Sequence, residues 1–370
     1  MKLFTPLCLL ALLTGSCISY KEKVFLARNK TWPEDSYHGY LPVNRKSRDY
    51  IFYWFFPSRK YPTTDPLIIW LTGGPGCSSS VAVLKENGPF LLSDAGEPVI
   101  NKYSWNNKAN IIYVDSPIGT GFSIAGEKKD RATGEEQIAT NLYEFMLEFL
   151  QKFPDLQGRA FYITGESYAG KYIPWFSNHV VTQNAKLDKS SKLKINLKGI
   201  MIGNGMVNPE WQFPAYFNFS SHHQLITIPD QQKLAPAFQF CHGLLRNGAT
   251  EQAYNYCETL INALLVNPIT GRFKFNYYNI TLPCITQNCY DDSKLIKFMR
   301  SEEVKNVLEQ RGENWKECKD DIYLRLMADQ PINAAQKLVD VLEAGVQVMG
   351  YYGELDFICN WEGGLSWMNN

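Results

Sequence analysis

A serine stands at a sharp turn between a predicted strand and a predicted helix. The apolar and β-prone residues 160–163 come just before the turn, and small residues, Gly165 and Ala169, lie two positions to either side of Ser167. Larger side chains there would collide with neighbouring strands, so the pattern predicts a nucleophile elbow that presents the Ser167 hydroxyl at the carboxyl end of a sheet. So short a pattern also arises by chance, so further motifs in the chain are needed to identify Ser167 as a nucleophile.

Short apolar runs with turn residues between them recur along the chain. They lie at residues 50–56, 67–71, 110–114, 160–164, 199–203 and 346–352. Continuous runs of this length are typical of strands buried on both faces, as in a parallel sheet covered by helices. Residues 134–153 carry apolar side chains at helical spacing, from Ile138 to Phe149. The alternation predicts an α/β fold with a mainly parallel sheet and helices on both faces.

Residues 206–300 interrupt this rhythm. They contain four cysteines, many aromatic residues and two glycosylation sequons, but no long apolar strand run. We interpret them as an insertion that forms a cap over the carboxyl end of the sheet. The alternative is a distorted continuation of the core.

Charge and the N-terminus limit the classes of partner. The formal net charge is zero and no basic block is present, so nothing points to nucleic acid or an anionic membrane. Lys2, the apolar run 3–13 and the small residues after it predict a secretory signal peptide over residues 1–19. The run is too short to span a membrane. After cleavage we expect no membrane association.

Cysteines and sequons agree with secretion. Cys8 and Cys17 fall in the predicted signal peptide, and the seven others are Cys77, Cys241, Cys257, Cys284, Cys289, Cys318 and Cys359. An odd number implies at least one free thiol in an oxidising compartment, and no spacing typical of a metal site occurs. Sequons begin at Asn29, Asn218 and Asn279.

A glycine-rich turn follows the run 67–71. Gly73, Gly74 and Gly76 let main-chain N–H groups converge on one small volume, which suits an oxyanion hole completed by the amide of Tyr168. A simple tight turn is the alternative. A phosphate-binding loop is disfavoured because no Gly-Lys-Ser/Thr follows.

A third element lies after the run 346–352. An acidic residue just past a buried strand and downstream of the serine occupies the place of the acid in the chain order serine, acid, histidine. On spacing alone, either Glu354 or Asp356 fits.

With these three motifs the chain resembles the serine carboxypeptidases of the carboxypeptidase Y and cathepsin A type. Further matching stretches are residues 37–44, 103–106, 110–117, 119–123 and 202–205, so the resemblance extends from about residue 37 to the end. It implies an α/β-hydrolase fold with core segments at 20–205 and 301–370, separated by a cap at 206–300. It also implies that no metal or organic cofactor is needed.

The resemblance assigns roles to individual residues. Ser167 matches the nucleophile and Asp356 the acid, and Gly74 and Tyr168 match the oxyanion donors. The residues that match those binding the free carboxylate of the substrate are Trp70, Gly73, Glu86 and Glu166. Two carboxyl groups near a substrate carboxylate must share protons, so we expect binding and hydrolysis to favour acidic pH.

The resemblance also places the cysteines. It implies the disulfides Cys77–Cys318 and Cys284–Cys289, which leaves Cys241 to pair with Cys257. Cys359 then corresponds to a free thiol near the active site.

Two positions depart from the family pattern. Thr72 stands where the family usually has Asn, so a shorter side chain with one donor replaces an amide. The general base should be a histidine after Asp356, but all five histidines precede it and Asn370 is reached without one. We therefore interpret the chain as a truncated copy of an active enzyme, with the end of the fold missing; the alternative is a catalytically dead homologue.

The sequence-based conclusion is a serine-type carboxypeptidase acting on peptide C-termini in the secretory pathway, either outside the cell or in a lysosome or vacuole. The alternatives are an acyltransferase with the same elbow and a non-catalytic binding or scaffolding protein. A homodimer is compatible with the resemblance.

Overall fold

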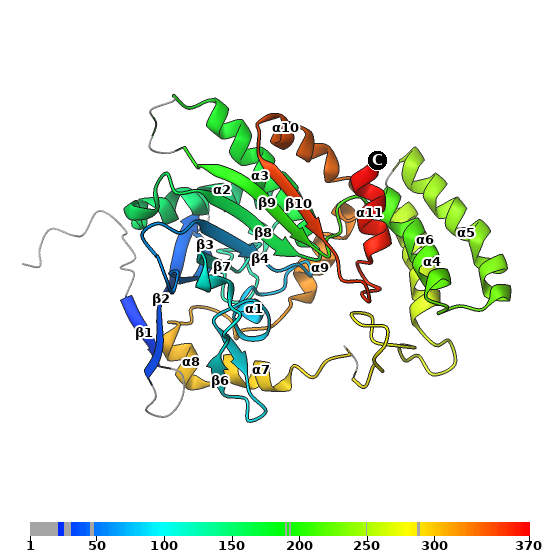
Figure 1. The fold of residues 1–370 in the computed structure, drawn as a ribbon, viewed down its shortest axis with the longest axis horizontal. Coiled ribbons are helices and arrows are strands. Elements are labelled where there is room, and N and C mark those ends of the chain that lie inside the picture. Colours follow the sequence, from blue (N-terminus) through cyan, green and yellow to red (C-terminus); the bar gives the residue numbers. More distant parts are fainter. Residues whose placement is uncertain are drawn as a thin grey trace, which may run out of the picture.

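Strands from the whole length of the chain form one mixed sheet (Figure 1). The structure, a computed structural model, describes residues 21–370 except 26–30, 45–47, 189–190, 192–193, 249 and 287–288. The predicted signal peptide, Cys8, Cys17 and the sequon at Asn29 lie outside the described residues. In the part described, no helix combines the length and hydropathy needed to cross a membrane.

The order of strands is β1-β2-β3-β7-β4-β8-β9-β10. Their bounds are Lys21–Phe25 (β1), Thr31–Val43 (β2), Asp49–Phe56 (β3), Asn110–Val114 (β7), Leu67–Leu71 (β4), Phe161–Glu166 (β8), Leu197–Gly203 (β9) and Gln347–Tyr351 (β10). The pairs from β7 to β10 are parallel, and the pairs from β1 to β7 are antiparallel. A separate hairpin pairs β5, Phe90–Leu92, with β6, Pro98–Ile100. The predicted α/β fold with a mainly parallel sheet is confirmed, and each predicted apolar run is a strand.

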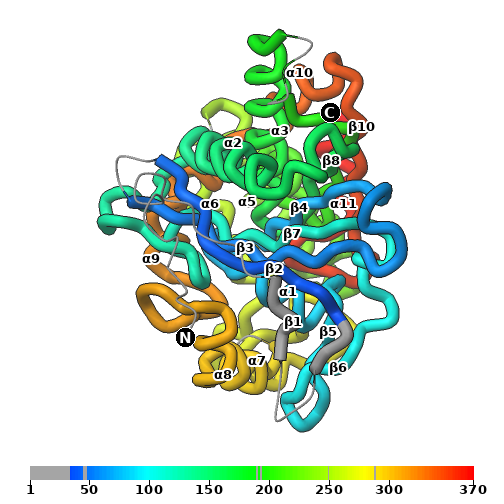
Figure 2. Tube along the Cα trace, turned by 90° about the vertical axis from the view of Figure 1, so that its left-hand side faces the viewer, coloured from blue at the N-terminus to red at the C-terminus, as the bar shows by residue number. Residues whose placement is uncertain are grey.

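Helices cover both faces of the sheet because successive side chains of a strand point to opposite sides. Tyr53 and Phe55 of β3 pack into one cluster with α2 and α3, whereas Phe52, Trp54 and Phe56 pack into a second cluster with α1 and α7. In Figure 2, α2 and α3 lie on one side of the strands and α7 and α8 on the other.

The helices have the following bounds: α1 Ser80–Lys85, α2 Glu135–Lys152, α3 Ala169–Ala185, α4 Pro209–His222, α5 Ile228–Asn247, α6 Glu251–Leu265, α7 Ser293–Met299, α8 Glu302–Val307, α9 Asp320–Arg325, α10 Leu338–Glu343 and α11 Trp361–Asn369. Short 3₁₀ turns lie at Trp105–Asn107, Lys128–Asp130, Pro154–Leu156, Met327–Asp329 and Ala335–Lys337.

The segment predicted as a cap has a hydrophobic cluster of its own. Helix α4 packs against α11 at one end of the sheet, and α5 and α6 pack against α4 and against each other (Figure 1). The disulfide Cys241–Cys257 joins α5 to α6 inside this cluster. Phe357, fully buried, belongs to the same cluster, so these helices pack against the segment that carries Asp356. The exact domain boundaries at 205/206 and 300/301 stay a prediction.

Phe149 offers a test of the core. Its ring is fully buried on α2 and contacts the rings of Tyr53, Phe55 and Phe153. We expect Phe149→Ala to lower the free energy of unfolding by about 3–5 kcal/mol, because it leaves a cavity in a packed cluster. Phe240→Ala on α5, where the ring is 57% exposed, is the control and should cost far less. Equal losses in urea unfolding would contradict this placement of the core.

Candidate functional site

Ser167 occupies a strained turn between β8 and α3. Its φ is +57°, a left-handed conformation that is uncommon for a non-glycine residue. Main-chain hydrogen bonds from the end of β9 fix it: the Ser167 N–H donates to the carbonyl of Gly203 at 3.0 Å, and the Met206 N–H donates to the carbonyl of Ser167 at 3.0 Å. A Cβ atom at Gly165 would overlap the carbonyl oxygen of Leu71 on β4. The turn therefore has the tight geometry of a nucleophile elbow.

The glycine-rich loop after β4 lies directly against this elbow. A Cβ atom at Gly73 would overlap the amide nitrogen of Tyr168 and lie 2.9 Å from Cβ of Ser167. Gly74 has a φ of +110°, which its lack of a side chain permits. The loop and the amide of Tyr168 are thus close enough to present main-chain donors to one volume beside the serine, as an oxyanion hole requires.

A buried aspartate supports the loop from behind. Asp115 Oδ1 accepts hydrogen bonds from the Ser78 hydroxyl at 2.7 Å and from the Ser79 N–H at 2.9 Å, and Oδ2 accepts from the Phe122 N–H at 2.8 Å. Burial raises the pKa of Asp115 to about 6, against the opposing effect of these donors. Sequence reasoning did not assign Asp115 a role; a lone acid directly after the apolar run 110–114 was the available signal.

The disulfide Cys77–Cys318 fastens the same loop to a distant part of the chain, at a sequence separation of 241. The Cys77 N–H donates to the carbonyl of Gly73 at 3.1 Å. The third disulfide joins Cys284 to Cys289.

Asp356, and not Glu354, has the surroundings of a triad acid. Glu354 is exposed, whereas Asp356 is buried. Asp356 Oδ2 accepts from Asn204 Nδ2 at 2.6 Å, and Oδ1 accepts from the Ile358 N–H at 3.0 Å. Burial raises the pKa of Asp356 to about 7. The sequence did not single out Asn204, although its stretch 202–205 matches the family pattern.

Cys359 connects the acid segment to the nucleophile. Its thiol is free and buried and lies within hydrogen-bonding reach of the Ser167 side chain. Its N–H donates to Asp356 Oδ2 at 3.3 Å. Burial raises the pKa of the Cys359 thiol, so it is protonated at neutral pH. Cys359 therefore contacts both Ser167 and Asp356, which brings the segment of the acid next to the nucleophile.

Glu86 and Glu166 form a carboxyl pair next to Ser167. The two side chains share a hydrogen bond, and Oε2 of Glu86 is shielded from solvent without a further partner. Burial raises the pKa of both groups, and the charge of Glu166 adds to the rise at Glu86. One proton is therefore retained between them well above the usual range of a carboxyl group.

The remaining predicted carboxylate-binding residues lie on β4 and the loop after it. Trp70 donates from its indole Nε1 to the Thr72 hydroxyl at 3.1 Å, and the Thr72 N–H donates to the Ser79 hydroxyl at 3.0 Å. Trp70 in turn contacts Trp105 edge to face, with ring centroids 5.3 Å apart. Because the Thr72 oxygen accepts from Trp70, its own proton is the one left to donate to a ligand.

The histidines lie away from this site. In the described chain, none of the five hydrogen-bonds Ser167 or Asp356. They are His38 on β2, His179 on α3, His222 and His223 at the end of α4, and His242 on α5. His222 pairs with Glu362 at 3.0 Å. Among the described residues there is also no cluster of three potential metal ligands from His, Cys, Asp and Glu.

Comparisons with known proteins identify the family and the fold that the chain resembles. The model of the serine carboxypeptidase family matches residues 28–370. Serine carboxypeptidase-like 47 of Arabidopsis thaliana is 36% identical over 339 residues, which is 90% of this chain but 66% of that protein. A serine carboxypeptidase-like protein of Oryza sativa subsp. japonica is 37% identical over 337 residues, 89% of this chain and 76% of its own length.

A solved structure shares the fold. The crystal structure of Kex1Δp, a prohormone-processing carboxypeptidase from Saccharomyces cerevisiae, matches with a TM-score of 0.81 and 29% identity, over 90% of this chain and 76% of that one. The chain spans about two thirds of the length of the first two curated relatives, 66% and 64%.

Gly73 tests the close approach of the loop to the elbow. A methyl group at this position would overlap the main chain at Tyr168, so we expect Gly73→Ala to lower the melting temperature clearly. Gly243→Ala is the matched control, because Gly243 lies in α5 with nothing within 4 Å of the new methyl group. Helix propensity predicts that this control is stabilised by up to about 1 kcal/mol. A tolerated Gly73→Ala would contradict the packing of the loop.

The raised pKa of Glu86 predicts how the free energy of unfolding changes with pH. Between the ordinary pKa of Glu86 and its raised value, the folded state holds a proton that the unfolded chain has released. Stability then falls as pH rises through this window, by up to about 1.4 kcal/mol per pH unit for one proton. We expect Glu86→Gln to match the native protein near pH 4 and to exceed it at pH 8 in urea unfolding. The exposed Glu343→Gln should follow the native curve, and parallel curves for all three proteins would refute the raised pKa.

Proposed function

Because the chain belongs to the serine carboxypeptidase family, we propose that it is built to release single residues from the C-termini of peptides, through an acyl-enzyme on Ser167. The observation that supports this most is the buried Glu86–Glu166 carboxyl pair, whose side chains share a hydrogen bond beside the elbow. A free peptide carboxylate is the natural acceptor for the shared proton, so the pair would hold the chain end one residue away from the nucleophile.

The chemistry we propose begins with attack by the Ser167 hydroxyl oxygen on the last peptide carbonyl. The negative charge that develops on the oxygen of the attacked carbonyl would be stabilised by the amides of Gly74 and Tyr168. The last residue would leave as the amine with the proton that the base took from the serine, and water would then release the acyl group from Ser167. Asp356 would orient the base that takes the serine proton. Carboxylate binding would involve Trp70, Thr72 and Gly73 together with the glutamates.

The base is the part of this proposal that the 370 residues do not contain. No histidine follows Asp356 within them. Loss of a triad member costs several orders of magnitude in rate and leaves the catalysis that binding and the oxyanion hole provide. We infer that these residues alone bind peptides and react slowly at Ser167.

The two rival functions use the same elbow. An acyltransferase would pass the acyl group to an alcohol instead of water, but it has no need of a site for a free peptide carboxylate, so the Glu86–Glu166 pair favours the peptidase. A purely binding homologue would keep that site and lack any reactivity at Ser167.

We also propose that the protein enters the secretory pathway, toward the cell exterior or a lysosome or vacuole. Three disulfides in the described chain support an oxidising compartment. Asn218 on α4 is exposed, as a glycosylation site requires. The predicted homodimer stays a prediction.

Peptide binding tests the carboxylate site without requiring catalysis. At pH 5 we expect a peptide with a free C-terminus to bind at least about tenfold more tightly than its C-terminal amide, since one charge-assisted hydrogen bond is at stake. Calorimetry should show this preference weakening as the pH rises and the pair loses its proton, and disappearing in Glu86→Ala. Glu343→Ala is the control. Equal binding of acid and amide in the native chain would refute the proposed site.

Phosphonate labelling tests the nucleophile. We expect an alkyl phosphonofluoridate to modify Ser167 slowly, and Ser167→Ala to remain unlabelled by mass spectrometry. An inert Ser167 in a chain that binds free-acid peptides would favour the binding homologue. Label on another serine would contradict the assignment of Ser167.

A further inference from the structure

The turn that carries Glu86 lacks a regular secondary structure to hold it. Glu86 is the first residue after the short helix α1 and has non-helical dihedral angles, φ −125° and ψ −108°. Gly88 approaches Val83 so closely that a Cβ atom would overlap its main chain. The direction of the Glu86 carboxyl group therefore depends on whatever fixes residues 86–89.

Every main-chain carbonyl of this turn accepts a hydrogen bond from residues 59–105. Asn101 Nδ2 donates to the carbonyls of Glu86 at 3.2 Å and Gly88 at 2.9 Å. The carbonyl of Asn87 accepts from the Ser104 hydroxyl at 3.1 Å and from the Trp105 N–H at 2.9 Å. The carbonyl of Pro89 accepts from Arg59 Nη2 at 3.1 Å and from the Asn101 N–H at 2.8 Å.

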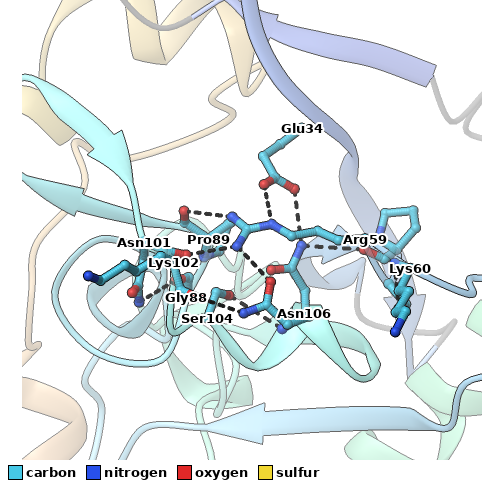
Figure 3. Close-up of polar contacts among 12 residues, drawn as sticks. Glu34, Arg59, Lys60, Gly88, Pro89, Asn101, Lys102, Ser104 and Asn106 are labelled. Carbon is cyan, nitrogen blue, oxygen red and sulfur yellow. Dashed lines mark hydrogen bonds and ion pairs between the residues drawn. The ribbon is translucent and has the colours of Figure 1, made fainter.

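Arg59 is the centre of these contacts (Figure 3). Besides Pro89, its guanidinium donates from Nη1 to the carbonyl of Asn101 at 2.7 Å and to Asn107 Oδ1 at 3.0 Å. Its Nε donates to the carboxylate of Glu34. One planar group thus joins the turn 86–89 to the segment 101–107 that supplies the other donors.

Glu34 anchors this arrangement to the sheet. It lies on β2, and its side chain is only 8% exposed. Its Oε2 accepts from Asn106 Nδ2 at 3.1 Å, while its Oε1 accepts from Arg59. The main-chain N–H of Arg59 also donates to the carbonyl of Asn106 at 2.8 Å. The buried charge of Glu34 is therefore paired, and Arg59 is fixed at both its main chain and its side chain.

We propose that Glu34, Arg59 and Asn101 form a clamp that positions Glu86 for the C-terminal carboxylate of the substrate. The clamp touches neither substrate nor nucleophile; it acts through the turn 86–89. It rests on the proposed function, because Glu86 is the group that it aims. A carboxyl pair that shares one proton needs its two members at a fixed separation, and Glu166 is already fixed at the end of β8. The clamp supplies the corresponding restraint on Glu86.

The test compares variants of the clamp with a matched arginine elsewhere. Arg59→Met removes the guanidinium, and Glu34→Gln/Arg59→Met does so without leaving a buried unpaired charge, so a folding defect in the single variant can be recognised. Asn101→Asp keeps the shape and removes the amide donors. Arg159→Met is the control, since Arg159 also donates to main-chain carbonyls, those of Asp65 and Asp155, away from Glu86.

The decisive readout is the ratio of affinities for a peptide and its C-terminal amide at pH 5. We expect this ratio to fall about tenfold in the double variant and in Asn101→Asp, as when a charge-assisted hydrogen bond is lost, and to be unchanged in Arg159→Met. Amide exchange should become faster in residues 86–92 of the clamp variants. A lower melting temperature with the native ratio would mean that the clamp is only structural and would overturn the proposal.

Failure of the proposed function gives a different result. If the native chain does not prefer the free acid, Glu86 binds no carboxylate and the proposed function is wrong. The clamp then has no carboxylate site to serve, and that part of its proposal is wrong too. Native amide exchange at residues 86–92 in the double variant would separately refute the restraint on the turn 86–89.

Discussion

The left-handed turn at Ser167 is the constraint on which the site depends. Its main chain is held by hydrogen bonds with Gly203 at the end of β9 and with Met206 just after it, in addition to the bond from Gly170 of its own helix α3. Gly165 packs closely against Leu71, and Gly73 packs closely against Tyr168. These contacts bring the loop after β4 next to Ser167. Nucleophile and candidate oxyanion donors are positioned by backbone, which resists displacement better than side chains do.

The site also depends on the protonation of its buried carboxyl groups. Glu86, Glu166 and Asp356 are all carboxyl groups whose pKa burial raises. Three ionised carboxylates in one confined volume would repel each other and an incoming peptide carboxylate. The site can therefore bind a peptide carboxylate only if part of this negative charge is neutralised, either by protons or by a cationic base opposite Asp356.

Local patterns in the sequence were sufficient for the sheet and the elbow. Apolar runs such as 110–114 have only one stable environment, between two layers of helices, and the small residues around Ser167 permit only one kind of turn. The contacts between distant segments were not predictable in this way. Asn204 beside Asp356, Asp115 behind the glycine loop and Arg59 behind Glu86 are polar residues whose partners lie tens of positions away, and no local periodicity encodes such pairs.

The disulfide from Cys77 to Cys318 has a consequence for biosynthesis. Cys77 leaves the ribosome early, yet its partner is the 241st residue after it. During that interval its thiol is exposed to every cysteine synthesised in between, and contacts of such separation form late because the intervening chain must first be ordered. In an oxidising compartment, any early pairing of Cys77 with one of these cysteines has to be reversed by thiol–disulfide exchange before the glycine-rich loop can be joined to Cys318.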